Sequence, residues 1–82
     1  MPYALKISDS AIDKLRSLPK ALRRQIGQKL DSLERDFQGD VKKLVGHKNR
    51  YRLRVGSYRV LFALESGRIL VYGVTDRKDA YE

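Results

Sequence analysis

The 82-residue sequence predicts an α+β fold in which a helical hairpin packs on a mostly antiparallel sheet, in the order β-α-α-β-β-β. Three observations predict this fold. Two stretches that alternate apolar with basic or polar residues flank a Gly-Ser pair, two stretches with helical periodicity precede them, and short strand-like stretches lie near both ends of the chain. A chain of this length can build one modest core, so we expect a single domain over residues 1–82.

The predicted hairpin at residues 51–62 organises the sheet. Its sequence, YRLRVGSYRVLF, places a two-residue turn at Gly56 and Ser57. Glycine at the first turn position suits a type II′ turn, which needs a positive φ there. This turn fixes the strand register. One face then pairs apolar residues only: Val55 with Tyr58, Leu53 with Val60, and Tyr51 with Phe62.

The other face of the hairpin is basic. The register pairs Arg54 with Arg59, and Arg52 and Arg50 follow on the same face. Like charges directly opposite each other destabilise a sheet, so the pairing indicates a site for an anion between the guanidinium groups. The alternative is that these long side chains spread into solvent, as most surface charges do.

The first half of the chain predicts a strand and two helices. Residues 2–7 alternate as a strand does, and Pro2 is tolerated at its start. Residues 8–10 are candidate N-caps for a first helix that ends before Pro19. Proline suits the first position of the second helix, which ends near Gly39. A helical hairpin this tight can cover one side of a sheet. The apolar stripes are Ala11, Ile12, Leu15 and Leu18 in the first helix, and Leu22, Ile26, Leu30, Leu33 and Phe37 in the second.

The segments around the hairpin are less regular. Residues 41–49 predict an irregular basic connection, which Leu44 and Val45 are expected to hold on the core. After the hairpin, a turn at residues 65–67 leads into a last strand at residues 68–74. That strand is apolar on both faces, which predicts a position buried in the sheet interior.

The register of the last strand bears on the basic face. Counting back from the turn places Gly73 opposite Arg59, where a missing side chain leaves space beside the guanidinium group. The same parity carries Thr75 and Arg77 toward the basic face.

Basic residues dominate the chain and cluster in its middle. The net charge is +8 at pH 7, and residues 8–40 mix both signs. Residues 41–59 contain no acid and seven basic residues, Lys42, Lys43, Lys48, Arg50, Arg52, Arg54 and Arg59. This distribution predicts a polyanionic partner such as a nucleic acid.

The composition excludes several chemistries. The chain has no cysteine and one histidine, which rules out disulfides, cysteine nucleophiles and zinc sites built from thiolates or several histidines. We therefore expect no metal and no cofactor. No apolar run approaches the roughly 20 residues of a spanning helix, and the first residues lack the apolar core of a signal peptide. We expect a cytoplasmic protein with no membrane partner.

These features together resemble a known family. The string YRLRVGSYRVLF, followed after one more strand by DRKDAY and preceded by a helical hairpin, resembles the RelE/ParE superfamily of bacterial toxins, and most closely its RelE-like branch. The resemblance implies a RelE-like fold and the toxin of a type II toxin–antitoxin system, with a cognate acidic antitoxin. It also implies an mRNA interferase, an endoribonuclease that enters the ribosomal A site and cleaves mRNA without a metal. In that reaction the RNA 2′-hydroxyl attacks the adjacent phosphate and leaves a 2′,3′-cyclic phosphate.

The resemblance also assigns candidate site residues. It places catalytic roles on Arg52, Arg54, Arg59, Arg77 and Tyr81. Arginine suits stabilisation of the phosphorane, because its planar fork matches phosphate oxygens and it stays charged. The basic residues of the connection are candidate RNA-binding residues: Lys42, Lys43, His47, Lys48 and Arg50.

The general acid and base are left open by the sequence. Some family members have lysine where this chain has arginine on the first hairpin strand, and some have histidine near the terminal arginine, where this chain has Asp76. Tyr81 is the first candidate, and the alternative is that its ring only packs. Imidazole is a common acid–base group, but His47 precedes the strand. Asp76 and Asp79 are further candidates, with capping or ion pairing as their alternatives.

Two other functions stay open. A ParE-like inhibitor of DNA gyrase would keep the fold without nuclease activity, although it has little reason to assemble the arginines and Tyr81. A non-catalytic nucleic-acid-binding module would need only the positive charge.

Overall fold

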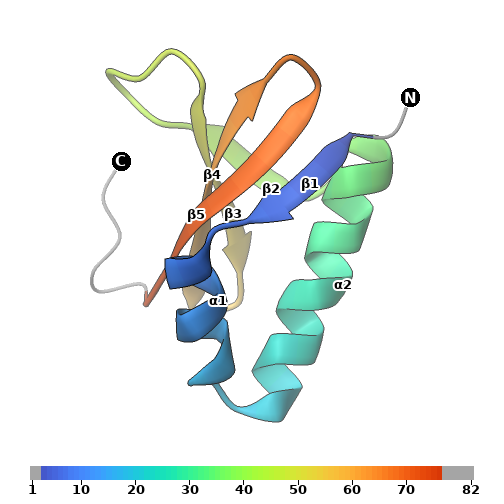
Figure 1. Ribbon diagram of the computed structural model, residues 1–82, viewed down its shortest axis with the longest axis vertical. Coiled ribbons are helices and arrows are strands. Elements are labelled where there is room, and N and C mark those ends of the chain that lie inside the picture. The colour runs from blue at the N-terminus through green and yellow to red at the C-terminus, as the bar shows by residue number, and fades with distance from the viewer. Residues whose placement is uncertain (1–2, 77–82) are drawn as a thin grey trace.

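The computed structural model describes residues 3–76 as a two-layer α+β fold, with two helices on one face of a five-stranded sheet (Figure 1). The strands lie in the order β1-β5-β4-β3-β2, and neighbours are antiparallel except for β1 and β5, which are parallel. The predicted fold class is confirmed. The elements are β1 (Ala4–Ile7), α1 (Asp9–Arg16), α2 (Lys20–Asp36), β2 (Asp40–Lys43), β3 (Arg50–Val55), β4 (Tyr58–Glu65) and β5 (Arg68–Asp76).

The helical hairpin follows the predicted caps with one difference. Ser8 is the N-cap of α1, and its Oγ accepts a hydrogen bond from the N–H of Ala11 at 3.2 Å, which satisfies a free amide of the first turn. Pro19, predicted as the first residue of α2, is instead its N-cap, because its extended backbone (ψ 148°) turns the chain between the helices. Within the described part of the chain, neither helix has the length and apolar character needed to cross a membrane.

Phe37 ends α2 and anchors it to the sheet. It adopts a left-handed conformation (φ 55°, ψ 38°), which costs a non-glycine residue about 1–2 kcal/mol. Its ring lies against those of Tyr3, Tyr51 and Phe62, with centroid distances of 5.2, 6.1 and 6.0 Å. Each such aromatic pair contributes about 0.5–1.5 kcal/mol, so these contacts offset the backbone strain.

The β3-β4 hairpin has the predicted turn and register. Gly56 has a positive φ of 60°, as a type II′ turn requires. The three predicted apolar pairs and the Arg54–Arg59 pair are all present. The apolar face of the hairpin is the floor of the core. Its buried residues Leu53, Val55, Val60 and Phe62 pack with Ile26, Leu30 and Leu33 of α2.

The segment predicted as an irregular connection contains a strand. Residues 40–43 form β2, which pairs with β3 and places Val41 opposite Leu53 on the core side. One apolar residue among three charged ones is too weak an alternation to predict a strand. Leu44 is buried as predicted. Val45, also predicted on the core, is 76% exposed, because the chain leaves the sheet there and enters the loop before β3.

A β-bulge interrupts the pairing of β4 with β5. Phe62 pairs with Val71, whereas its neighbour Leu61 pairs with Gly73. Tyr72 is therefore an extra residue on β5. This strand lies in the sheet interior, as predicted, with β1 and β4 as its neighbours. Its second face is not covered, and Leu70 is 42% exposed there.

The turn between β4 and β5 and the bulge together change the predicted place of Gly73. The sequence predicts it opposite Arg59 with open space beside it, but it lies opposite Leu61, whose Cδ1 would be 3.4 Å from an added Cβ. Thr75 lies opposite Arg59, on the basic face as predicted. The prediction placed Leu64 opposite Arg68 after a three-residue turn. The turn has two residues and puts Leu64 opposite Ile69, and the extra residue of the bulge shifts the pairs beyond it by one more.

Candidate functional site

The face of the sheet that the helices leave uncovered, here called the open face, carries the predicted arginines. Successive side chains of a strand point to opposite faces. Because Leu53 points into the core, Arg52 and Arg54 point to the open face. Arg59 of β4 lies directly opposite Arg54. We call Arg52, Arg54 and Arg59 the arginine cluster.

The three arginines differ in their exposure. Arg54 is exposed, whereas Arg52 and Arg59 are half-buried. Nη1 of Arg52 is buried, and Nη1 of Arg59 donates a hydrogen bond to the carbonyl oxygen of Tyr58 at 3.4 Å. A partly desolvated guanidinium group attracts an anion more strongly than one in bulk water, because the local dielectric constant is lower. The cluster is thus suited to bind and stabilise negative charge.

The strand register extends the Arg54–Arg59 row to both sides. Asp40 of β2 lies opposite Arg54, where a carboxylate offsets part of the like-charge repulsion. The sequence prediction missed Asp40, because it begins a strand that was not recognised. On the other side, Oγ1 of Thr75 is buried and makes no hydrogen bond within residues 3–76. Buried polar atoms are normally hydrogen-bonded, so this hydroxyl beside Arg59 is one that a bound ligand could satisfy.

Three of the predicted RNA-binding residues lie on strands β2 and β3, and two of them flank the cluster. Lys42 lies opposite Arg52 on the open face. Arg50 lies two residues before Arg52 on β3, on the same face. Lys43 pairs with Tyr51 and therefore lies on the face of the sheet that the helices cover, at its edge. The structure thus brings Lys42 and Arg50 to the cluster but not Lys43.

The remaining predicted residues lie away from the cluster or beyond the described chain. His47 and Lys48 are exposed in the loop before β3, at the opposite end of that strand from Arg54. Asp76 pairs with Tyr58, which lies on the covered face, so Asp76 also lies on that face. This position makes Asp76 a weaker candidate for the general base. Arg77, Asp79 and Tyr81 lie outside the residues that the structure describes.

Among residues 3–76, no group of three or more His, Asp or Glu side chains is placed to hold a metal ion. The arrangement can supply electrostatic stabilisation through arginine and, at its edge, the Thr75 hydroxyl.

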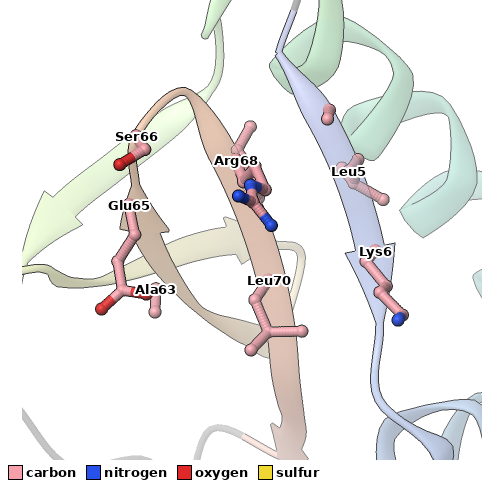
Figure 2. A pocket seen from close by; sticks show the side chains of 9 residues that line it. Leu5, Lys6, Ala63, Glu65, Ser66, Arg68 and Leu70 are labelled. Atoms are coloured by element: carbon pink, nitrogen blue, oxygen red, sulfur yellow. The ribbon is translucent and has the colours of Figure 1, made fainter.

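A second feature of the open face, here called the apolar hollow, lies over β1, β5 and the turn between β4 and β5 (Figure 2). Its volume is about 510 Å³. Leu5 and Leu70 give it apolar surface, and Lys6, Arg68 and Glu65 add charged groups around it (Figure 2). The sequence prediction missed the hollow because β5 was expected to be covered on both faces. Its lining residues are Ala4, Leu5, Lys6, Ala63, Glu65, Ser66, Arg68, Ile69 and Leu70.

The sequence matches a toxin family along almost its whole length. The model of the family described as the ParE toxin of the type II toxin–antitoxin system parDE matches residues 5–81. A relative named Toxin RelE3, from Methanocaldococcus jannaschii, is 32% identical over 77 residues, which cover 87% of this chain and 86% of that protein.

Solved structures have the same fold. A chain of the archaeal RelE-RelB complex from Pyrococcus horikoshii OT3 matches with a TM-score of 0.82 and 33% identity, covering 98% of this chain and 100% of that one. The toxin–antitoxin complex RelBE2 from Mycobacterium tuberculosis matches with a TM-score of 0.81 over 94% of this chain and 100% of that one, and at 21% identity it supports the fold alone. The chain therefore belongs to the RelE/ParE superfamily and is the toxin of a type II toxin–antitoxin system.

Proposed function

We propose that this toxin is a ribosome-dependent mRNA endoribonuclease that works without a metal ion. The observation that carries the proposal is the arginine cluster, in which Arg54 and Arg59 lie opposite each other on an uncovered face. No packing requirement explains two like charges there. Each guanidinium group can present two parallel N–H donors to one phosphate. The similarity to Toxin RelE3 supports the same assignment.

The proposed reaction uses the RNA as its own nucleophile. The 2′-hydroxyl attacks the adjacent phosphorus, a pentacovalent phosphorane forms, and the bond to the 5′-oxygen of the next nucleotide breaks. The 2′-hydroxyl loses its proton, the leaving oxygen gains one, and the products are a 2′,3′-cyclic phosphate and a 5′-hydroxyl. The arginine cluster stabilises the phosphorane, and donors that are already in place need no reorganisation as its charge develops.

Other groups must move the protons. Arginine is a poor base because it stays protonated, so the acid and base come from elsewhere. We assign one of these roles to Tyr81, which with Arg77 follows the end of β5. That strand runs beside the cluster, since Thr75 lies opposite Arg59 one residue before the strand ends at Asp76.

The partners follow from the charge and from the relatives. The Pyrococcus toxin forms a complex with RelB, and a chain of net charge +8 favours an acidic cognate antitoxin that covers the basic surface. In the active state the same surface contacts mRNA in the ribosomal A site. The proposed RNA contacts outside the catalytic set are Lys42, Lys43, His47, Lys48 and Arg50.

A gyrase-directed toxin is the second candidate, because the matching family description names ParE. That activity is an interaction between proteins and does not require arginines placed for a phosphorane. Parallel assays with programmed ribosomes and with DNA gyrase separate the two candidates.

Replacement of Arg59 tests the nuclease proposal. Single-turnover cleavage of mRNA on programmed ribosomes, at saturating toxin, should fall about 10²–10³-fold in Arg59→Ala, as expected for loss of one well-placed donor. Arg59→Lys should recover only part of the rate, because it keeps the charge and loses the bidentate fork. Arg24→Ala, on the exposed surface of α2, is the matched control and should cleave at the wild-type rate. A wild-type rate in Arg59→Ala would remove Arg59 from the site.

Tyr81→Phe separates acid–base chemistry from packing. If the phenol transfers a proton, the variant should cleave more slowly at saturation while it binds the ribosome with unchanged affinity. If the ring only packs, cleavage should be close to wild type, and the assignment of Tyr81 is wrong.

A further inference from the structure

Tyr72 and Arg50 form a cation–π pair on the open face. Tyr72 is the extra residue of the β-bulge. The Cζ atom of Arg50 lies 4.8 Å from the centroid of its ring, within the range of a cation–π contact. Tyr72 is half-buried and Arg50 is exposed. The pair therefore presents a flat guanidinium group, backed by an aromatic ring, to the surface.

The bulge is what brings Tyr72 to this face. Val71 and Val74 are both buried in the core, although they are three residues apart and a regular strand would turn one of them outward. The extra residue restores the alternation of side chains between the two faces, so Tyr72 lies on the open face while both valines stay buried. Bulges are over-represented beside active sites, where they redirect a side chain.

The Arg50–Tyr72 pair lies beside the arginine cluster. Arg50 and Arg52 are two residues apart on β3, which corresponds to about 7 Å along the strand. On β5, Tyr72 directly precedes Gly73, which lies across from Leu61, and Leu61 in turn lies across from Arg52. A nucleotide whose phosphate is bound by the cluster thus has its neighbour within reach of the pair.

We propose that the Arg50–Tyr72 pair is the platform on which a base of the mRNA stacks next to the phosphate that is cut. The inference rests on the proposed function. Single-stranded RNA is commonly bound by stacking its bases on aromatic rings and on guanidinium planes. Here the guanidinium group is already held over the ring, so little conformational freedom is lost on binding.

The chemistry of stacking defines what the platform does. Every base has a flat face, so stacking tolerates base identity. The pair positions the RNA for in-line attack and adds affinity, without reading the sequence. Its loss should therefore raise the concentration of toxin needed for half-maximal cleavage more than it lowers the maximal rate.

Fluorescence of a stacked base tests the platform directly. Ribosomes are programmed with mRNA that carries 2-aminopurine at each A-site codon position in turn, and a 2′-O-methyl group that blocks the attacking hydroxyl. Wild-type toxin should quench the fluorescence at one position, because 2-aminopurine is quenched when it stacks. Tyr72→Phe, which keeps the ring, should do the same. Tyr72→Leu and Arg50→Ala should lose most of the quenching at concentrations that saturate their binding.

Cleavage of unmodified mRNA gives the second measurement. The half-saturating concentration should rise about 5- to 160-fold in Tyr72→Leu, the range found for loss of one base–aromatic stack. Arg50→Lys should lie between Arg50→Ala and wild type. Arg24→Ala is again the control, and thermal melting checks that each variant is folded.

The outcomes separate the platform from the proposed function. Unchanged quenching and unchanged half-saturation in both Tyr72→Leu and Arg50→Ala would overturn the platform. A lower melting temperature with both readouts unchanged would also overturn it, because the pair would then only brace the sheet. Wild-type toxin that quenches the probe but cannot cut unmodified mRNA would refute the nuclease and leave the platform standing. Toxin that does not bind programmed ribosomes would refute both.

Discussion

Two neighbouring pairs in the β3-β4 hairpin show that the faces of this sheet serve different purposes. Leu53 faces Val60 beneath the helices, where both side chains are buried and each contributes about 1.5–3 kcal/mol. One residue further along, Arg54 faces Arg59 on the open face, where like charges oppose each other at a cost in stability. The covered face is built for packing, and the open face is built for a ligand that the charges bind.

The largest expected difference between the faces is in stability. Leu53→Ala should lower the free energy of unfolding by about 2–5 kcal/mol, because it leaves a cavity in the core. Arg54→Ala should change it by less than about 1 kcal/mol, because it relieves repulsion and removes little packing. Urea denaturation measures both. An equal loss in the two variants would break the comparison and give Arg54 a structural role.

The salt dependence of ribosome binding tests the role of the charges on the open face. Binding to programmed ribosomes should weaken steeply as the salt concentration rises, because each neutralised phosphate releases counterions. In a plot of log affinity against log salt concentration, Arg54→Ala should reduce the slope by roughly one. Arg24→Ala, on the helical side, should leave the slope unchanged. Affinity that is flat across salt would favour docking on a protein surface.

The smallest expected effect concerns the helical layer alone. Gly27 lies in α2 and is exposed, and no atom lies within 4 Å of an added Cβ. Gly27→Ala should stabilise the helix by about 0.5–1 kcal/mol and raise the melting temperature by about 2–8 °C. Cleavage should stay at the wild-type rate. A loss of cleavage would show that the helical layer also contributes to function.

The sequence predicts those parts of the fold that depend on neighbouring residues. The hairpin register follows from the turn at Gly56 and from the alternation on both sides of it, and every predicted pair is present. The strand β2 was missed because four residues with one buried valine, Val41, carry little periodic signal. The bulge was missed because the last strand is apolar on both faces, so the sequence does not show that Val71 and Val74 both face the core.

The residues of the site likewise fall into those that the sequence predicts and those that it does not. The sequence brings together Arg52, Arg54 and Arg59 because one turn sets all three. Asp40 and Tyr72 were not predicted, because their places depend on an unrecognised strand and on the bulge. Residues positioned by distant pairings need the three-dimensional structure, however clear their chemistry is.

The parallel pairing of β1 with β5 joins the first and last strands of the described chain. Contacts between residues far apart in sequence form slowly, because the intervening chain must first be closed into a loop. Strands β3, β4 and β5 are joined by two-residue turns and can pair within microseconds. We expect this three-stranded meander to form early and β1 to dock last. Until it docks, β5 has an unpaired edge of the kind on which chains aggregate. The rate at which β1 docks therefore determines how much of the toxin aggregates during folding.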